Sequence, residues 1–329
     1  MILVTGASGF LGSAVVRKLI NRKHDVRAMV RPTSDRSNLE GLALDIVEGD
    51  LLDKASLKSA IDGCSGLFHV AADYRLWTPD PAPMFNVNVL GTKTILLAAS
   101  ECGVKRIVYT SSVAVLGNLP GNLSADENTP VNFNDMIGPY KQSKYLAEIE
   151  VRKLITSHNL DVVIVNPSTP IGPRDIRPTP TGRMIVEAAS GRMPAYVDTG
   201  LNVVHVDDVA EGHLLAFERG AVGQGYILGG ENILLKDILY NIASITDGKG
   251  PRFKIPTNAI LPFAYIAEFW AKITGGKEPF ASVDSLLMAK KKMYFSHKKA
   301  SNELGYVPRP ANQALVDAVQ WFYNHNYIS

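Results

Sequence analysis

The sequence of 329 residues predicts a doubly wound α/β fold, in which helices cover both faces of a parallel sheet. Short apolar runs rich in β-branched residues alternate with helical patterns through the first half of the chain, as in strand–helix–strand units. These runs carry few polar residues, which strands buried on both faces require. Three glycines also lie within residues 6–12, between the first expected strand and the first expected helix.

The expected elements follow in order along the chain. The first strand spans residues 2–4, and Leu11, Val15 and Leu19 then share one helix face through their i, i+4, i+8 spacing. Further helices are expected at residues 88–100 and from about Tyr140 to Thr156. The other expected strands of this half are residues 25–30, 44–48, 66–70, 106–110 and 161–165.

The composition changes after Asn166, because five prolines occur between residues 167 and 180. Such a segment continues neither a helix nor a central strand. We therefore expect one domain of residues 1–165 and a smaller, mostly helical substrate lobe of residues 166–329. Residues 203–206 resemble one more strand, and Asp207 is a plausible cap for a helix through Phe217. Residues 200–220 are expected to return and pack on the first domain.

Charge and composition exclude several classes of protein. The 34 basic and 32 acidic residues give a net charge of +2, which provides no reason to expect nucleic acid as a partner. The two cysteines and seven histidines lack metal-ligand spacing, so no metal site is predicted. The first residues lack a secretory signal pattern, and the most apolar later stretch is too short to span a bilayer. We expect a cytoplasmic protein without a membrane span.

The glycine turn predicts a site for nucleotide phosphates. Its spacing is G-x-x-G-x-x-G, which differs from the G-x-G-x-x-G fingerprint of dinucleotide-binding folds. Glycines still allow a tight turn and close approach of a pyrophosphate to the positive end of the next helix. A turn that needs positive φ explains one glycine but not three. We predict a Rossmann domain whose cofactor contacts are Gly6, Ser8, Gly9, Phe10, Leu11 and Gly12.

The residue at the end of the second strand favours NADP (NADPH) over NAD. An acidic residue about 20 positions after the turn would bind the ribose hydroxyls of NAD. Here the position holds Val30 or Arg31, and the guanidinium of Arg31 can pair with a 2′-phosphate, assisted by Ser34 or Arg36. The alternative is a solvated arginine at a strand end.

Two further pairs are candidate cofactor contacts. Asp50 and Leu51 follow the third strand, where a carboxylate can accept from the adenine amino group. A simple turn or helix cap explains Asp50 nearly as well. Ala71 and Ala72 are small residues after the fourth strand, at the sheet edge where ligands of this architecture bind.

The strongest chemical signal is the pair Tyr140 and Lys144, which an i, i+4 spacing places on one helix face. A nearby ammonium favours the phenolate and is expected to lower the pKa of Tyr140, which makes it a proton donor or acceptor near neutral pH. Ser111 and Ser112 end the fifth strand, where a hydroxyl can hold the substrate oxygen beside Tyr140. An exposed tyrosine–lysine pair formed by chance is the alternative.

These motifs resemble the extended short-chain dehydrogenase/reductases. The matching segments are residues 6–12, 50–51, 88–92, 110–112, 140–144, 205–210 and 303–306. The resemblance implies that Tyr140 is the acid/base, that Lys144 orients the ribose and tunes Tyr140, and that Ser112 rather than Ser111 aligns the oxygen. It also implies nicotinamide contacts from Pro167 and Ser168 and a homodimer through the helices that carry Asn88 and Tyr140.

Two branches of that family compete. Residues 30–31 and 68–72 resemble dihydroflavonol 4-reductase and related carbonyl reductases. Nucleotide-sugar epimerases and dehydratases commonly carry an arginine before residues 205–207 and an Arg-Pro-Gly-Asp stretch near the end, and both are missing here. Arg174 keeps that branch open, and residues 226–232 resemble hopanoid-associated sugar epimerase-like proteins.

The substrate is expected to be a small carbonyl compound. Leu261, Phe263, Tyr265, Phe269 and Trp270 offer apolar surface for a hydrophobic or aromatic substrate, although core or dimer packing more often explains such a cluster. We predict NADPH-dependent reduction of a ketone or aldehyde, with a nucleotide-sugar epimerase or dehydratase that keeps its NAD(P) bound as the alternative. A non-catalytic dinucleotide sensor is a minor alternative, since such proteins typically lose the tyrosine or the lysine.

Overall fold

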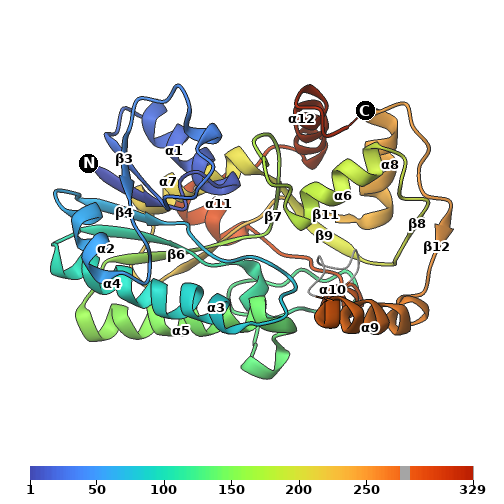
Figure 1. Cartoon of the computed structure of the whole chain (residues 1–329), viewed down its shortest axis with the longest axis horizontal. Helices are drawn as coiled ribbons and strands as arrows, with labels where there is room; N and C mark the ends of the chain where they lie inside the picture. The colour runs from blue at the N-terminus through green and yellow to red at the C-terminus, as the bar shows by residue number, and fades with distance from the viewer. Residues whose placement is uncertain (275–281, 329) are drawn as a thin grey trace.

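The computed structural model describes residues 1–274 and 282–328 (Figure 1). The described part of the chain contains a seven-stranded sheet in the order β10-β6-β5-β4-β1-β2-β3, and every neighbouring pair is parallel. The fold class predicted from the sequence is confirmed. The strands are β1 (Ile2–Thr5), β2 (Val26–Val30), β3 (Asp45–Glu48), β4 (Gly66–His69), β5 (Arg106–Thr110), β6 (Val162–Pro167) and β10 (Gly225–Leu228).

Helices cover both faces of this sheet (Figure 1). One face packs against α1 (Phe10–Asn21), α7 (Val206–Arg219) and α11 (Lys298–Leu304), and the other against α2 (Lys54–Ile61), α4 (Thr92–Glu101) and α5 (Gly138–His158). Side chains of β1 alternate between the two cores: Ile2 and Val4 join the first, and Leu3 joins the second. Burial on both faces explains why the strands are almost entirely apolar.

Three features of the sheet and its helices differ from the sequence-based expectation, and the first is α2, which was not predicted. The strand β10 beside β6 was not predicted, because it has four residues and two glycines follow it directly. Asp207 does not cap α7. The cap is His205, whose Nδ1 accepts a hydrogen bond from the Asp207 backbone N–H at 3.0 Å. A ring nitrogen thus replaces the carboxylate that cap preferences favour.

The second region lies beyond the carboxyl ends of the strands (Figure 1). The core of this region is built by residues of β7 (Thr169–Ile171), α6 (Pro180–Ala189), β9 (Gly200–His205), α8 (Leu235–Ile245) and α12 (Ala311–Asn324). The proposed division between residues 165 and 166 remains a prediction. The other elements of this region are β8 (Ala195–Tyr196), β11 (Glu231–Leu234), β12 (Phe253–Lys254), α9 (Thr257–Thr274) and α10 (Val283–Met288).

The aromatic residues of α9 point outward. Phe263, Tyr265, Phe269 and Trp270 are between 57% and 71% exposed, while Ala264 of the same helix packs against α10. The sequence left open that these four aromatic side chains pack in the chain's own core. Their exposure shows that this interpretation is wrong. Among the helices that the structure describes, none combines the length and apolar character that crossing a membrane requires.

Candidate active site

Two positions of the glycine turn have no room for a side chain. Gly6 has φ +65°, and a Cβ placed on it would lie 2.8 Å from the Cα of Ala71. A Cβ on Gly12 would lie 2.0 Å from the carbonyl oxygen of Gly6. Gly9 begins α1 without a side-chain cap, and the first turn of α1 carries no acidic residue. The turn therefore fits the phosphates of a dinucleotide, because the backbone N–H groups at the start of α1 have no partner within the helix.

The loop that carries Ala71 and Ala72 is fastened to this turn. The hydroxyl oxygen of Thr5 accepts a hydrogen bond from the Ala71 N–H at 3.1 Å and lies 2.8 Å from Nδ1 of His69. The other ring nitrogen of His69 lies 3.0 Å from the hydroxyl of Thr92. Burial, with Lys144 nearby, lowers the pKa of His69 to about 3, so the ring is neutral at physiological pH. Hydrogen bonds of the neutral His69 ring to Thr5 and Thr92 thus link β1, β4 and α4 next to the glycine turn.

Arg31 directly follows β2 and is exposed. Its backbone N–H donates to Oγ of Ser34 at 3.1 Å, and within the described residues no acceptor meets its guanidinium. The guanidinium of Arg36 pairs with Glu48 at 2.6 Å, so this residue is already engaged. Arg31 is therefore the unpaired cation at the end of β2, and Ser34 is beside it.

Asp50 and Leu51 have structural partners of their own. The carboxylate of Asp50 accepts a hydrogen bond from the Leu52 N–H at 2.8 Å, which is the turn that the sequence offered as an alternative. Leu51 is buried, and a Cβ on Gly91 would lie 2.9 Å from the Cβ of Leu51. Their contact with adenine remains a prediction.

Lys144 is buried at the carboxyl end of β5. Its ammonium donates to the carbonyl oxygen of Thr110 at 2.8 Å and to the hydroxyl of Tyr109 at 3.2 Å. It also lies 4.8 Å from the centroid of the Tyr109 ring. Burial lowers the pKa of Lys144 to about 8, while Glu148 raises it. The side chain is thus fixed, and it is charged at neutral pH.

Burial raises the pKa of Tyr140, and the hydroxyl of Ser112 acts in the opposite direction. The expectation that Lys144 lowers the pKa of Tyr140 is therefore wrong for this structure. The reason is burial, which disfavours the charged phenolate, and the ammonium of Lys144 donates its hydrogen bonds to Thr110 and Tyr109. Tyr140 is accordingly protonated at neutral pH, which is the state that a proton donor needs.

The structure distinguishes the two serines after β5. Ser111 is 5% exposed, and in the described chain its Oγ has no hydrogen-bond partner. Ser112 is more open, and its Oγ accepts from the Ala114 N–H at 3.1 Å at the start of the 3₁₀ segment η3 (Val113–Val115). Since Ser112 is the serine that affects the pKa of Tyr140, the geometry favours it as the partner of that phenol.

Asn88 positions the helix that carries Tyr140. It belongs to a π-helical segment, η2 (Asn86–Gly91), between α3 (Ala82–Phe85) and α4, and such segments often occur at functional sites. Its amide nitrogen donates to Oγ of Ser143 at 2.9 Å, and that hydroxyl donates to the carbonyl oxygen of Tyr140 at 2.9 Å. The sequence indicated Asn88 only through its motif, and this contact chain explains the asparagine.

Pro167 ends β6, and Ser168 lies immediately beyond it. The Ser168 N–H donates to the carbonyl oxygen of Leu228 at 3.3 Å, whereas its buried Oγ has no partner among the residues described. Asn166 donates to the carbonyl oxygen of Ser112 at 3.2 Å, which ties β6 to the serine loop. The Ser168 hydroxyl is thus available to a ligand at this sheet edge.

Two residues join the glycine turn to the second region, and sequence reasoning did not connect them. The side-chain amide of Asn38, in the 3₁₀ segment η1 (Ser37–Leu39), donates to the carbonyl oxygens of Ser8 at 3.2 Å and Arg174 at 3.0 Å. Arg174 has φ +76° and forms an ion pair with Asp207. A lone asparagine in a polar loop gives no signal in a single sequence.

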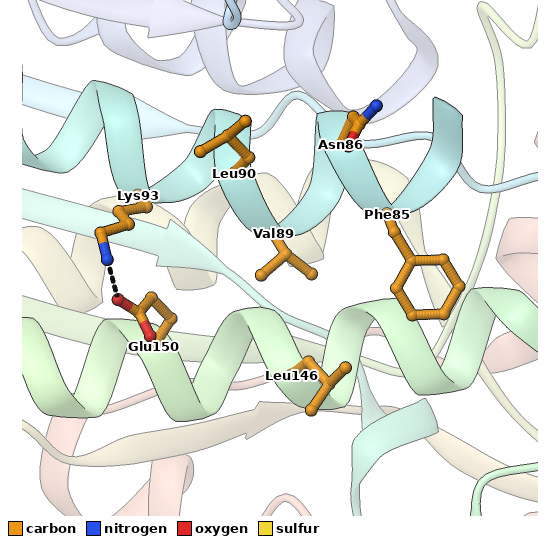
Figure 2. Close-up of a pocket in the computed structure, with 7 residues that line it drawn as sticks. All are labelled: Phe85, Asn86, Val89, Leu90, Lys93, Leu146 and Glu150. Atoms are coloured by element: carbon orange, nitrogen blue, oxygen red, sulfur yellow. Dashed lines mark ion pairs between the residues drawn. The ribbon is translucent and has the colours of Figure 1, made fainter. Parts of the chain in front are cut away.

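A surface groove of about 340 Å³ lies between α5 and the helical stretch η2–α4 (Figure 2). Lys93 and Glu150 form an ion pair of 2.8 Å at one end of the groove, and Leu90 is 51% exposed. None of Ser112, Tyr140 and Lys144 lines it, so it is separate from the candidate catalytic groups. Its lining residues are Phe85, Asn86, Val89, Leu90, Lys93, Leu146 and Glu150.

Comparison with known proteins identifies the family. Residues 2–229 match the model of the NAD dependent epimerase/dehydratase family. A protein of Synechocystis sp. named "Putative dihydroflavonol 4-reductase" is 46% identical over 331 residues, which cover 99% of this chain and 95% of that protein. The crystal structure of gox2253 is 54% identical, with a TM-score of 0.90, and covers 100% of this chain and 99% of its own.

A more distant solved structure is PA4631, a nucleoside-diphosphate-sugar epimerase from Pseudomonas aeruginosa. It is 25% identical with a TM-score of 0.83, and the match covers 100% of this chain and 99% of that chain.

The fold and the site thus define an enzyme of the extended short-chain dehydrogenase/reductase type that uses a nicotinamide dinucleotide. Within that class, the chain belongs to the NAD-dependent epimerase/dehydratase family.

Proposed function

We propose that the protein is an NADPH-dependent carbonyl reductase of the dihydroflavonol 4-reductase type, acting on a ketone or an aldehyde. The observation that carries this proposal is Tyr140, a phenol that burial keeps protonated beside the hydroxyl of Ser112. A carbonyl oxygen gains a proton when the carbon is reduced, and a positioned phenol supplies it. The 46% identity to a relative with a reductase name supports the same conclusion.

Residues at the carboxyl edge of the sheet have separate roles in the proposed reaction. Bound NADPH supplies the hydride in this chemistry. Ser112 donates a hydrogen bond to the carbonyl oxygen, and Tyr140 gives that oxygen its proton. Lys144, held by Thr110, orients the ribose. The residues proposed to hold the dinucleotide are Gly6, Ser8, Gly9, Phe10, Leu11, Gly12, Arg31, Asp50, Leu51, Ala71, Ala72, Tyr140, Lys144, Pro167 and Ser168.

A nucleotide-sugar epimerase or dehydratase is the second candidate function, and Arg174 favours it. Its Nε is buried and unpartnered within the described chain, so it retains a donor for a diphosphate. Asn202 lies on the strand before His205, where sugar-nucleotide enzymes commonly carry an arginine. Its amide nitrogen instead donates to the carbonyl oxygens of Gly230 and Phe295, both at 3.1 Å. Asn202 therefore serves the fold, which favours the reductase.

Incubation with two substrate classes separates these functions. With NADPH and a panel of aldehydes and ketones, we expect NADPH oxidation to equal the alcohol formed, measured by absorbance at the nicotinamide band and by product analysis. With UDP-sugars we expect no interconversion. Sugar interconversion without net change in the cofactor, together with no carbonyl reduction, would overturn the reductase.

Replacement of Arg31 by alanine is expected to weaken NADPH binding about 10- to 100-fold and to leave NADH binding nearly unchanged. The reason is that only NADPH carries the 2′-phosphate that the guanidinium would meet. Fluorescence titration of both cofactors measures the effect. Arg36→Ala is the matched control, because Arg36 is already paired with Glu48. Equal losses for the two cofactors in Arg31→Ala would contradict the NADPH preference.

The homodimer is also a proposal. The groove of Figure 2 lies on the two helices to which the family resemblance assigns the partner, and the exposed Leu90 offers it apolar surface. A hydrophobic or aromatic substrate gains no support from the exposed aromatic residues of α9, because they line neither this groove nor the cavity described next.

A further inference from the structure

A small polar cavity lies at the start of α5. Its volume is about 100 Å³, and its walls include Gly117, Asn118, Asp135, Lys141 and Lys291. Because a water molecule occupies about 30 Å³ in the liquid, the space suits a few waters or one carboxylate or phosphate group.

Lys141 is the unusual group in this wall. It is 8% exposed, yet no described residue accepts a hydrogen bond from its ammonium or pairs with it. Lys144, about one turn further along the same helix, is 2% exposed and donates to Thr110 and Tyr109. Burial and the nearby Lys291 lower the pKa of Lys141 to about 8, so it still carries its charge at neutral pH. The ammonium of Lys141 therefore faces the cavity with hydrogen-bond donors that an anion there can accept from.

The other groups facing the cavity also lack a complete set of partners. The side-chain oxygen of Asn118 is buried, and the described structure offers it no donor. Asp135 is the one acidic group in the wall, and its carboxylate accepts from the Asn132 N–H at 2.9 Å within its own capping box. No described ion pair joins Asp135 to Lys141 or Lys291. Two lysines and one carboxylate give the cavity a net positive charge. The side-chain oxygen of Asn118 can accept a hydrogen bond from a hydroxyl group.

The cavity and the proposed proton donor share backbone on two sides. Lys141 follows Tyr140 directly, and consecutive Cα atoms are about 3.8 Å apart. Asn118 lies in the loop that begins at Ser112. Neither Ser112 nor Tyr140 lines the cavity, but the chain joins both residues to its wall, so a substrate that extends beyond its carbonyl group can reach Lys141.

We propose that Lys141 and Lys291 bind an anionic group, a carboxylate or a phosphate, on the substrate whose carbonyl lies at Tyr140. The substrates of this enzyme are then acidic aldehydes or ketones. This inference rests on the proposed reductase activity for the position of the carbonyl. The anion-binding cavity itself does not depend on that activity, and this separates the two tests.

Matched aldehydes test the substrate class. We expect kcat/KM for 3- or 4-formylbenzoate to exceed that for benzaldehyde, which lacks only the carboxylate. Lys141→Met is expected to raise KM for the preferred formylbenzoate about 10- to 100-fold and to leave benzaldehyde unchanged. Lys141→Arg, which keeps the charge, should retain the preference. Lys290→Met is the matched control, since Lys290 is exposed and does not line the cavity. Equal losses for both aldehydes in Lys141→Met would overturn the proposal.

Calorimetric titration with inorganic phosphate tests the cavity without turnover. We expect the wild-type protein and Lys290→Met to bind phosphate and Lys141→Met to bind at least about 10-fold more weakly. Phosphate binding that depends on Lys141, without any preference for the acidic aldehydes, would assign the cavity to a free anion and overturn the substrate assignment. If no aldehyde is reduced while phosphate binding still depends on Lys141, the proposed reductase fails and the anion site stands. Phosphate binding that is absent or independent of Lys141 overturns the site.

Discussion

Replacing Tyr140 by phenylalanine is expected to lower turnover with NADPH and a carbonyl substrate by about 10²- to 10⁴-fold, with little change in NADPH affinity. Phenylalanine keeps the aromatic ring of the half-buried Tyr140 but has no proton to give. Burial raises the pKa of Tyr140, so the wild-type phenol holds its proton at neutral pH and can donate it. Steady-state kinetics give kcat and KM, and fluorescence titration gives the NADPH dissociation constant.

Tyr145→Phe is the control for this variant. Tyr145 lies on the same helix and packs against Phe133 with ring centroids 6.2 Å apart. Its loss of a hydroxyl should leave turnover within about twofold of wild type. Wild-type turnover in Tyr140→Phe would show that another group donates the proton, and the reductase mechanism would have to be withdrawn.

The second large effect is expected at Gly12. An alanine Cβ there would lie 2.0 Å from the carbonyl oxygen of Gly6, 2.7 Å from its carbonyl carbon and 3.1 Å from the Cα of Ala7. All three atoms are backbone, so no flexible side chain can move aside. We expect Gly12→Ala to lower the free energy of unfolding by about 1–3 kcal/mol or more. We also expect it to weaken NADPH binding at least about 10-fold, because the turn must open away from the phosphates.

Gly9→Ala provides the comparison within the same turn. Its added Cβ would meet only the carbonyl oxygen of Gly6, at 3.2 Å, and Gly9 has an ordinary φ of −76°. Urea denaturation and NADPH titration of the two variants should therefore differ clearly. Equal loss of stability and of binding in both would mean that the turn rearranges, and that the close approach at Gly12 does not limit it.

The sequence predicted the fold well where periodicity and burial agree. Apolar runs such as residues 106–110 became buried strands, because their side chains pack on both faces of the sheet. It failed where the outcome depends on contacts between distant segments. The four residues of β10 gain their strand conformation from pairing with β6, and four residues carry too little pattern to show this.

The site divides in the same way. Spacing alone brings Tyr140 and Lys144 to one helix face, but it does not say where the ammonium points. The partners of Lys144 are Thr110 and Tyr109, which the sequence separates from it by more than 30 residues. Burial of the phenol raises the pKa of Tyr140, which is opposite to the expectation. Lys141 shows the same limit, because nothing in a run of polar helical residues reveals that one lysine is buried without a partner.

The side-chain amide of Asn38 has a consequence for how the two parts of the molecule move. Its two hydrogen bonds, to the carbonyl oxygens of Ser8 and Arg174, hold the phosphate turn and the segment before α6 to the same nitrogen. Separating these segments breaks at least one bond, at a net cost of about 0.5–1.5 kcal/mol. A ligand that shifts one segment therefore changes the free energy of the other, and thermodynamic reciprocity makes the effect equal in both directions. Asn38 thus couples the expected dinucleotide-binding turn to the segment that leads into the proposed substrate lobe.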